Sequence, residues 1–184
     1  NYCIDAPSVP LTATPAPGNS LRWYNTATGG VGSATAPTPS TAATGVTSYY
    51  VSQVTALGCE GVRAQIDVIV NPDAHAEATY THFEDCAPWN INSSVIQPVL
   101  YPTQNGSYEW YANGIMIGTG TTFPGYTINL PGDSVLIKLK TISLFGCKND
   151  STSRWFYTPP VPVTDFTASD TVGCGPLSVS FTNT

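Results

Sequence analysis

The fold class is decided by the stretch Val135-Leu136-Ile137-Lys138-Leu139-Lys140-Thr141-Ile142, in which apolar and polar residues alternate. The apolar residues at 135, 137 and 139 fall on one face, and the two lysines fall on the other. Such a period of two predicts a half-buried antiparallel strand. Residues 47–54 and 65–70 have the same β-branched and aromatic character. No segment carries the apolar stripe of a helix, so the sequence predicts an all-β fold.

Turn-forming residues separate these stretches. Asn113-Gly114 lies between residues 108–111 and 115–117, which both read as strands. Asn-Gly is strongly preferred in two-residue hairpin turns because both positions need a positive φ. The sequence therefore predicts a β-hairpin centred on this dipeptide.

The sequence also repeats itself. A cysteine, then a Trp-Tyr pair, then a Gly-Cys pair occur twice: first as Cys3, Trp23-Tyr24 and Gly58-Cys59, and then as Cys86, Trp110-Tyr111 and Gly146-Cys147. A third start, Cys174-Gly175-Pro176, matches Cys86-Ala87-Pro88. Self-similarity of this kind predicts tandem domains of one architecture, with Trp23 and Trp110 as core tryptophans.

Prolines mark the expected domain boundaries. Asn71-Pro72 ends one predicted strand, and Pro159-Pro160-Val161-Pro162 ends the second repeat. Proline removes a ladder donor and stiffens a junction. We expect a β-sandwich at residues 1–71, either complete or short of its first strand, a second at 72–162, and a truncated third domain at 163–184.

Five cysteines raise the question of pairing. The repeat predicts one disulfide in each domain, Cys3 with Cys59 and Cys86 with Cys147, while Cys174 has its partner outside the chain. A zinc site is the rival interpretation, but no two cysteines stand at zinc-ligand spacing. Disulfides of this kind indicate an extracytoplasmic protein.

Several segments resemble a known family. Leu21 to Gly30, with Trp23-Tyr24 and Gly29-Gly30, and Gly58 to Arg63 look like the Ig-like repeats of very large Bacteroidota surface proteins. The second repeat and the segment from Phe166 resemble PKD-like repeats of the same proteins, although Trp110 to Gly114 stands where a PKD domain usually has a Gly-Asp-Gly turn. The fold expected is thus a series of tandem Ig-like/PKD-like antiparallel β-sandwich domains in an extended array.

The resemblance implies a function at the scale of that array. Proteins of this type include gliding-motility adhesins exported by the type IX secretion system. We therefore expect a stalk segment of a secreted cell-surface adhesin, located outside the outer membrane. Its expected partners are neighbouring repeats of the same chain, with surface polysaccharide or other surface proteins as further candidates. The alternative is a carbohydrate-binding module of a secreted polysaccharide-processing protein.

Composition argues against other functions. Six Lys and Arg residues against twelve Asp and Glu give a net charge of −6, which is unsuited to binding nucleic acid. No apolar run reaches the roughly 18–20 residues needed for membrane insertion. No Gly-x-Ser-x-Gly motif or similar nucleophile setting occurs, so an enzyme is not expected. Asp73, His75, Glu77 and His82 could be read as a metal site, but a solvated edge strand is the favoured interpretation, and we expect no metal and no cofactor.

Two kinds of surface site remain as hypotheses. Ser134, Ser151 and Thr171 each follow an aspartate and precede a small or apolar residue, a pattern that resembles the Bacteroidota O-glycosylation signal. Trp89, Trp155 and Tyr157, together with Phe156, could stack on sugar rings if they are exposed. The competing interpretation of these aromatic residues is core or inter-domain packing, which we favour.

Overall fold

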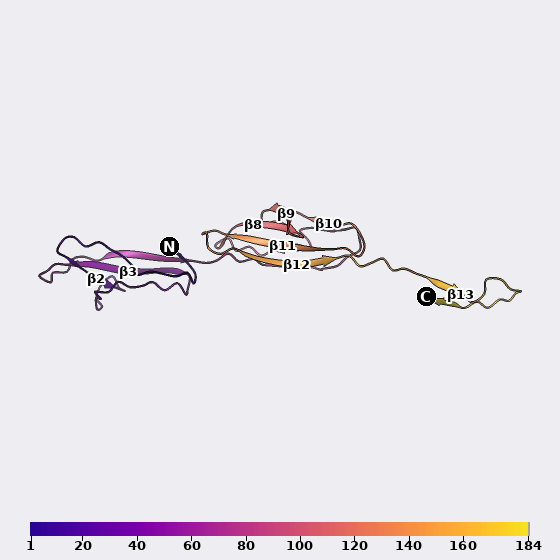
Figure 1. Ribbon diagram of the computed structural model, residues 1–184, viewed down its shortest axis with the longest axis horizontal. Coiled ribbons are helices and arrows are strands. Elements are labelled where there is room, and N and C mark those ends of the chain that lie inside the picture. The colour runs from indigo at the N-terminus through magenta and orange to yellow at the C-terminus, as the bar shows by residue number, and fades with distance from the viewer. Residues whose placement is uncertain (184) are drawn as a thin grey trace.

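The computed structural model describes residues 1–183, and these residues form an all-β protein. Its strands pair only within three groups (Figure 1). We call them the N-terminal unit (residues 1–71), the central unit (residues 72–162) and the C-terminal hairpin (residues 163–183). The groups follow one another along the long axis of the molecule (Figure 1).

The N-terminal unit contains one four-stranded sheet in the order β1-β4-β3-β2. Strand β1 (Tyr2–Cys3) runs parallel to β4 (Ala64–Asn71), whereas β3 (Gly45–Val54) is antiparallel to both β4 and β2 (Ser20–Tyr24). The small buried core of this unit consists of Trp23, Tyr24, Val51, Val54, Val68 and Val70.

Two proline-rich segments of this unit, residues 4–19 and 34–44, form no β-strand. The Leu11 N–H donates to the Pro37 carbonyl at 2.9 Å, and the Ser8 hydroxyl donates to the Pro39 carbonyl at 2.6 Å. Because proline has no N–H, segments this rich in proline make isolated hydrogen bonds rather than a continuous ladder.

The central unit is a two-layered sandwich. One layer is a four-stranded sheet in the order β12-β11-β8-β9, and two pairs, β10-β6 and β5-β7, complete the unit. The strands are β5 (Ala78–Tyr80), β6 (Trp89–Ile91), β7 (Ile96–Pro98), β8 (Asn105–Ala112), β9 (Ile115–Thr119), β10 (Tyr126–Ile128), β11 (Ser134–Ser143) and β12 (Asp150–Tyr157).

The alternation in residues 135–142 produces the core of the central unit, as predicted. Along β11 the side chains of Val135, Ile137, Leu139 and Thr141 are buried, and their neighbours face outward. Val135, Ile137 and Leu139 pack in one cluster with Trp110 of β8 and residues of the opposite layer. Strands β3 and β4 likewise cover the predicted stretches 47–54 and 65–70.

The predicted hairpin at Asn113-Gly114 is confirmed. Strands β8 and β9 flank this dipeptide, and Ala112 pairs with Ile115. Both turn residues have a positive φ, 48° for Asn113 and 84° for Gly114, which is the conformation that favours Asn-Gly at a two-residue turn.

The two units share one strand register. Val51 of β3 pairs with Trp23 and with Ala64 of β4, while Leu139 of β11 pairs with Trp110 and with Thr152 of β12. The offset is the same for both elements, since 139 − 51 = 88 and 152 − 64 = 88. Strands β3 and β4 are therefore the structural equivalents of β11 and β12.

The C-terminal hairpin begins as the central unit does. Strand β13 (Phe166–Ala168) pairs with β14 (Phe181–Asn183), and the exposed rings of Phe166 and Phe181 meet edge to face at 5.4 Å. The first residues of β5 and β13 differ by the same offset, since 166 − 78 = 88.

Candidate functional site: the junction between the N-terminal and central units

A disulfide bond joins the two units. Cys3 of β1 is bonded to Cys147, with their Cα atoms 5.5 Å apart and a sequence separation of 144. Cys147 lies in the turn between β11 and β12. We call this bond, together with residues 72–77 and Lys148, the junction. It links the end of one sheet to the beginning of the next.

This bond shows that the predicted pairing was wrong. Cys3 is not bonded to Cys59, nor Cys86 to Cys147; Cys59, Cys86 and Cys174 are free and exposed. Cys3 pairs with Asn71, at the end of the N-terminal sheet where Gly45 pairs with Val70. Cys59 lies beyond the other end of β3, about 30 Å away at the rise of an extended strand.

The same geometry separates the two cysteines of the central unit. Cys147 lies just before β12 begins, whereas Cys86 lies close to Glu84, which pairs with Tyr157 at the end of that strand. A disulfide needs Cα atoms within about 7 Å, so cysteines at opposite ends of a sheet cannot bond.

Backbone contacts reinforce the junction. The Ala74 N–H donates to the Lys148 carbonyl at 2.9 Å, and the Lys148 N–H donates to the Asp73 carboxylate at 3.1 Å. The Lys148 ammonium lies 3.9 Å from the other carboxylate oxygen of Asp73. Lys148, next to the disulfide, is therefore tied to residues 73 and 74 by two hydrogen bonds and one ion pair.

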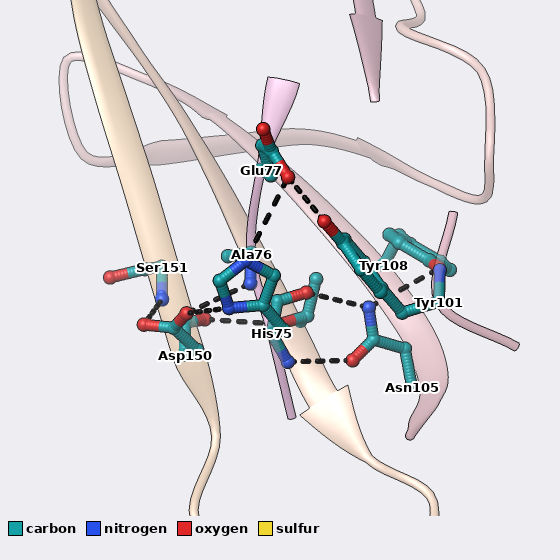
Figure 2. A network of polar contacts seen from close by, with 9 residues as sticks. His75, Ala76, Glu77, Tyr101, Asn105, Tyr108, Asp150 and Ser151 are labelled. Carbon is teal, nitrogen blue, oxygen red and sulfur yellow. Dashed lines mark hydrogen bonds and ion pairs between the residues drawn. The ribbon is translucent and has the colours of Figure 1, made fainter. Parts of the chain in front are cut away.

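A buried asparagine holds the connecting segment in place. Asn105, at the start of β8, accepts the His75 N–H at 2.9 Å and donates to the His75 carbonyl at 2.7 Å, as Figure 2 shows. Its amide also donates to the Tyr108 hydroxyl at 3.3 Å. Because an amide offers both a donor and an acceptor, it satisfies both backbone groups of His75.

Carboxylates complete this network (Figure 2). Asp150, the first residue of β12, accepts the Ala76 N–H at 2.8 Å and the Ser151 N–H at 2.8 Å. Glu77 accepts a hydrogen bond from the Tyr101 hydroxyl, and this bond raises the pKa of Tyr101 above its ordinary value. The side chains therefore bind residues 75–77 to strands β8 and β12.

The histidine of this segment packs among acidic and aromatic groups. Its Nε2 lies 3.8 Å from Glu77, its Nδ1 lies 3.7 Å from Asp150, and its ring meets Tyr101 edge to face at 4.7 Å. Residues 73–77 are not in a strand, in contrast to the edge strand considered from the sequence. Among residues 1–183, no group of three or more His, Cys, Asp or Glu side chains is arranged to hold a metal ion.

The N-terminal unit has a polar network that sequence reasoning missed. Glu60 accepts hydrogen bonds from the Ser52 hydroxyl at 2.6 Å and the Tyr24 hydroxyl at 2.5 Å, and the Ser52 bond is the main reason that the pKa of Glu60 is lowered. The Arg63 guanidinium lies 3.2 Å from the centre of the Tyr24 ring. No signal in the sequence marks this site, because strand pairing brings its residues together.

The proposed sugar-stacking residues differ in their exposure to solvent. Trp89 is only 4% exposed and packs against Phe156, which is fully buried, so the hypothesis is wrong for both. Trp155 and Tyr157 are 56% and 45% exposed and lie two apart on β12, hence on one face. The tryptophans expected in the core, Trp23 and Trp110, are both buried.

The three candidate glycosylation residues are all on the surface. Ser134 opens β11, Ser151 lies in β12, and Thr171 lies in the loop between β13 and β14; each is exposed. Their modification stays a prediction. No helix in the described part of the chain is long and apolar enough to cross a membrane.

A family model of an Ig-like domain matches the N-terminal unit. Residues 1–72 match the family model described as an Ig-like domain, CHU_C associated. Among solved structures, the chain is similar to fibronectin(III)-like modules of Clostridium thermocellum CbhA at 15% identity, over 82% of this chain and 84% of that one, with a TM-score of 0.34. The comparison with curated proteins gives no match.

The family match of residues 1–72 indicates a class of function. Ig-like domains are typically non-catalytic and serve as structural or interaction modules. An Ig-like domain and a disulfide bond also fit an extracellular protein.

Proposed function

We propose that this chain is a stalk segment of a secreted cell-surface adhesin, in which tandem domains at residues 1–71, 72–162 and from 163 onward are held in series. The observation that carries the proposal is the junction, where Cys3 is bonded to Cys147 between two units. A bond placed between units restricts their relative motion, and that is what a stalk needs in order to hold a distant tip away from a surface.

The surface chemistry supports this proposal. Charged residues make up only 10% of the chain, and its polarity comes largely from threonine and serine, which suits a passive extracellular spacer. The shared strand register of the two units and the matching start of the C-terminal hairpin support a tandem series. Gliding motility and export by the type IX system remain part of the proposal through the resemblance alone.

Two experiments test the stalk. Antibodies against the chain should label intact, unpermeabilised cells of the source organism, and labelling only after permeabilisation would contradict a surface location. Small-angle X-ray scattering should give the oxidised chain a longer maximum dimension and a narrower distance distribution than the C147S variant. Identical curves would show that the bond does not restrict the units.

Carbohydrate binding is the second candidate, because Trp155 and Tyr157 present two exposed rings on one face of β12. Aromatic rings can stack on the apolar faces of sugars. A glycan array probed with the chain and with the W155A variant tests this function: binding that W155A abolishes supports it. The absence of binding by the unmodified chain would leave the stalk as the better account.

A further inference from the structure

The free cysteines Cys59 and Cys86 occupy positions in their units that correspond to those of the bonded Cys147 and Cys3. Cys3 and Cys86 each come first in the repeat of cysteine, Trp-Tyr and Gly-Cys, and we call them opening cysteines. Cys59 and Cys147 each follow a glycine in the turn after a long strand, and we call them turn cysteines. The observed bond joins the opening cysteine of one unit to the turn cysteine of the next.

The turn cysteines are equivalent in detail. Cys59 follows Val51 at the same separation as Cys147 follows Leu139, the equivalent of Val51, since 59 − 51 = 147 − 139. The Cys59 N–H donates to the Thr55 hydroxyl at 3.1 Å, and the Cys147 N–H donates to the Ser143 hydroxyl at 3.1 Å. The glycines before them, Gly58 and Gly146, both have a positive φ, 85° and 73°.

The opening cysteines are equivalent as well. Cys3 pairs in parallel with Asn71, the last residue of β4. Glu84 pairs in parallel with Tyr157, the last residue of β12, and the same register extended two positions beyond that strand would place Cys86 opposite Pro159. Pro159 is the equivalent of Asn71, since 159 − 71 = 88. Cys86 therefore follows the bridge at the end of β12 by two residues, in a position that corresponds to that of Cys3 beside Asn71.

We propose that Cys59 and Cys86 are the remaining halves of two more inter-domain disulfides of the kind seen between Cys3 and Cys147. Cys86 bonds the turn cysteine of the domain that follows the central unit, and Cys59 bonds the opening cysteine of a domain that precedes the N-terminal unit. The partner in each case is an adjoining domain of the same kind in the same polypeptide, so the inference rests on the proposed tandem array.

The spacing after the central unit fits this rule. Cys174 follows Pro159 at the same separation as Cys86 follows Asn71, since 174 − 159 = 86 − 71, so the hairpin at 163–183 supplies the opening cysteine of the next unit. Under the same rule Cys174 bonds the turn cysteine of the domain after that one. Each domain is then fastened to its neighbour on both sides, and no bond lies within a domain.

The chemistry is an ordinary thiol oxidation. Two thiols lose two protons and two electrons and form one S–S bond, and a disulfide oxidant such as oxidised glutathione accepts them and is released as two thiols. Exposed cysteines can be reached by such an oxidant, and Cys59 and Cys86 are both exposed.

The test is disulfide mapping under a glutathione redox buffer, followed by alkylation and digestion without reduction. In residues 1–184 we expect one bond, Cys3–Cys147, with Cys59, Cys86 and Cys174 alkylated. In the chain extended by the adjoining domain on each side, Cys86 and Cys59 should be recovered bonded to those domains. A bond from Cys3 to Cys59 or from Cys86 to Cys147, or free Cys59 and Cys86 in the extended chain, overturns the proposal.

Cysteine variants test the same bonds by the number of thiols that each variant exposes. In the extended chain, C86S should expose one new thiol in the following domain, and C59S one in the preceding domain. Retention of Cys3–Cys147 in both variants shows that the two units have folded. C174S is the matched control and should change neither the bond of Cys86 to the following domain nor that of Cys59 to the preceding domain. A variant that keeps Cys3–Cys147 but exposes no new thiol contradicts the proposal.

Two further observations show which part of the proposal is wrong if the mapping contradicts it. Mixing isotopically labelled and unlabelled chains distinguishes neighbours in one polypeptide from a second copy, because only bonds between copies contain both labels; such bonds would overturn the assignment to adjoining domains. If the adjoining sequence encodes no similar domain, the proposed array itself fails. If the adjoining sequence encodes a similar domain whose cysteines are bonded to each other, the tandem array is retained and only the proposal of inter-domain disulfides is wrong.

Discussion

Cys3 and Cys147 are bonded to each other across a sequence separation of 144. Cys3 pairs with Asn71, the last residue of β4, and Cys147 lies in the turn before β12. The bond belongs to neither sheet. It fixes how two consecutive units meet, so its effects should be seen both in unfolding and in the shape of the molecule.

Breaking this bond should destabilise the chain. A disulfide that closes so long a loop contributes about 2–4 kcal/mol by restricting the unfolded state. We expect the C147S variant to lose stability in this range, measured by urea denaturation under non-reducing conditions. The C174S variant removes a cysteine that is free in the structure, and it should stay within about 0.5 kcal/mol of the unmodified chain. Equal losses for both variants would contradict a structural role of the junction.

Acid should weaken the N-terminal unit through Glu60. Its hydrogen bonds from Ser52 and Tyr24 lower the pKa of the folded carboxyl below 4.5, so the unfolded chain binds the proton more readily. The contribution of Glu60 is therefore complete above its unfolded pKa and is lost as the pH falls through the folded one. Thermal melts between pH 6 and pH 3 should show this decline, and E60Q should flatten it. The exposed carboxylate variant D165N should leave the decline unchanged.

Two adjacent residues of β12 should differ sharply in their effect on stability. Phe156 is fully buried among Tyr80, Phe83 and Trp89, so F156A should cost about 3–5 kcal/mol through lost burial and a cavity. Trp155 is 56% exposed, and W155A should cost less than about 1 kcal/mol. Denaturant titration of the two variants checks the contrast. A large loss in W155A would show that its ring is buried in solution.

Removing Asn105 should loosen the connecting segment. The N105A variant removes the side chain that bonds both backbone groups of His75, and each hydrogen bond lost costs about 0.5–1.5 kcal/mol. We expect faster hydrogen exchange at the His75 amide, measured by NMR or mass spectrometry. The N92A variant removes an amide that accepts from Ser94 outside the junction, so it should leave that exchange rate unchanged. Unaltered exchange in N105A would contradict the assigned role.

Glycosylation of Ser134, Ser151 or Thr171 should be visible in the protein isolated from its source. All three side chains are exposed, so a transferase could reach their hydroxyls. We expect an intact mass above that of the unmodified sequence, with a stepwise decrease when these residues are changed to alanine one at a time. A mass equal to that of the bare sequence would rule out modification under the growth conditions used.

Much of the local structure can be predicted from the residues alone. The alternation along residues 135–142 fixed which side chains of β11 are buried, because successive residues of a strand point to opposite faces. Asn113-Gly114 fixed the hairpin between β8 and β9, because both positions need a positive φ. The repeat of cysteine, Trp-Tyr and Gly-Cys also marked equivalent positions in the two units, as their common register shows.

The pairing of the cysteines and the exposure of the aromatic rings could not be predicted from the residues alone. The repeat suggested a bond within each unit, yet the length of β3 places Cys3 and Cys59 at opposite ends of one sheet. Trp89 and Trp155 look alike in sequence, but one faces the core and the other faces solvent. Both outcomes depend on which strand ends and faces meet in space, and residues far apart in the chain settle that.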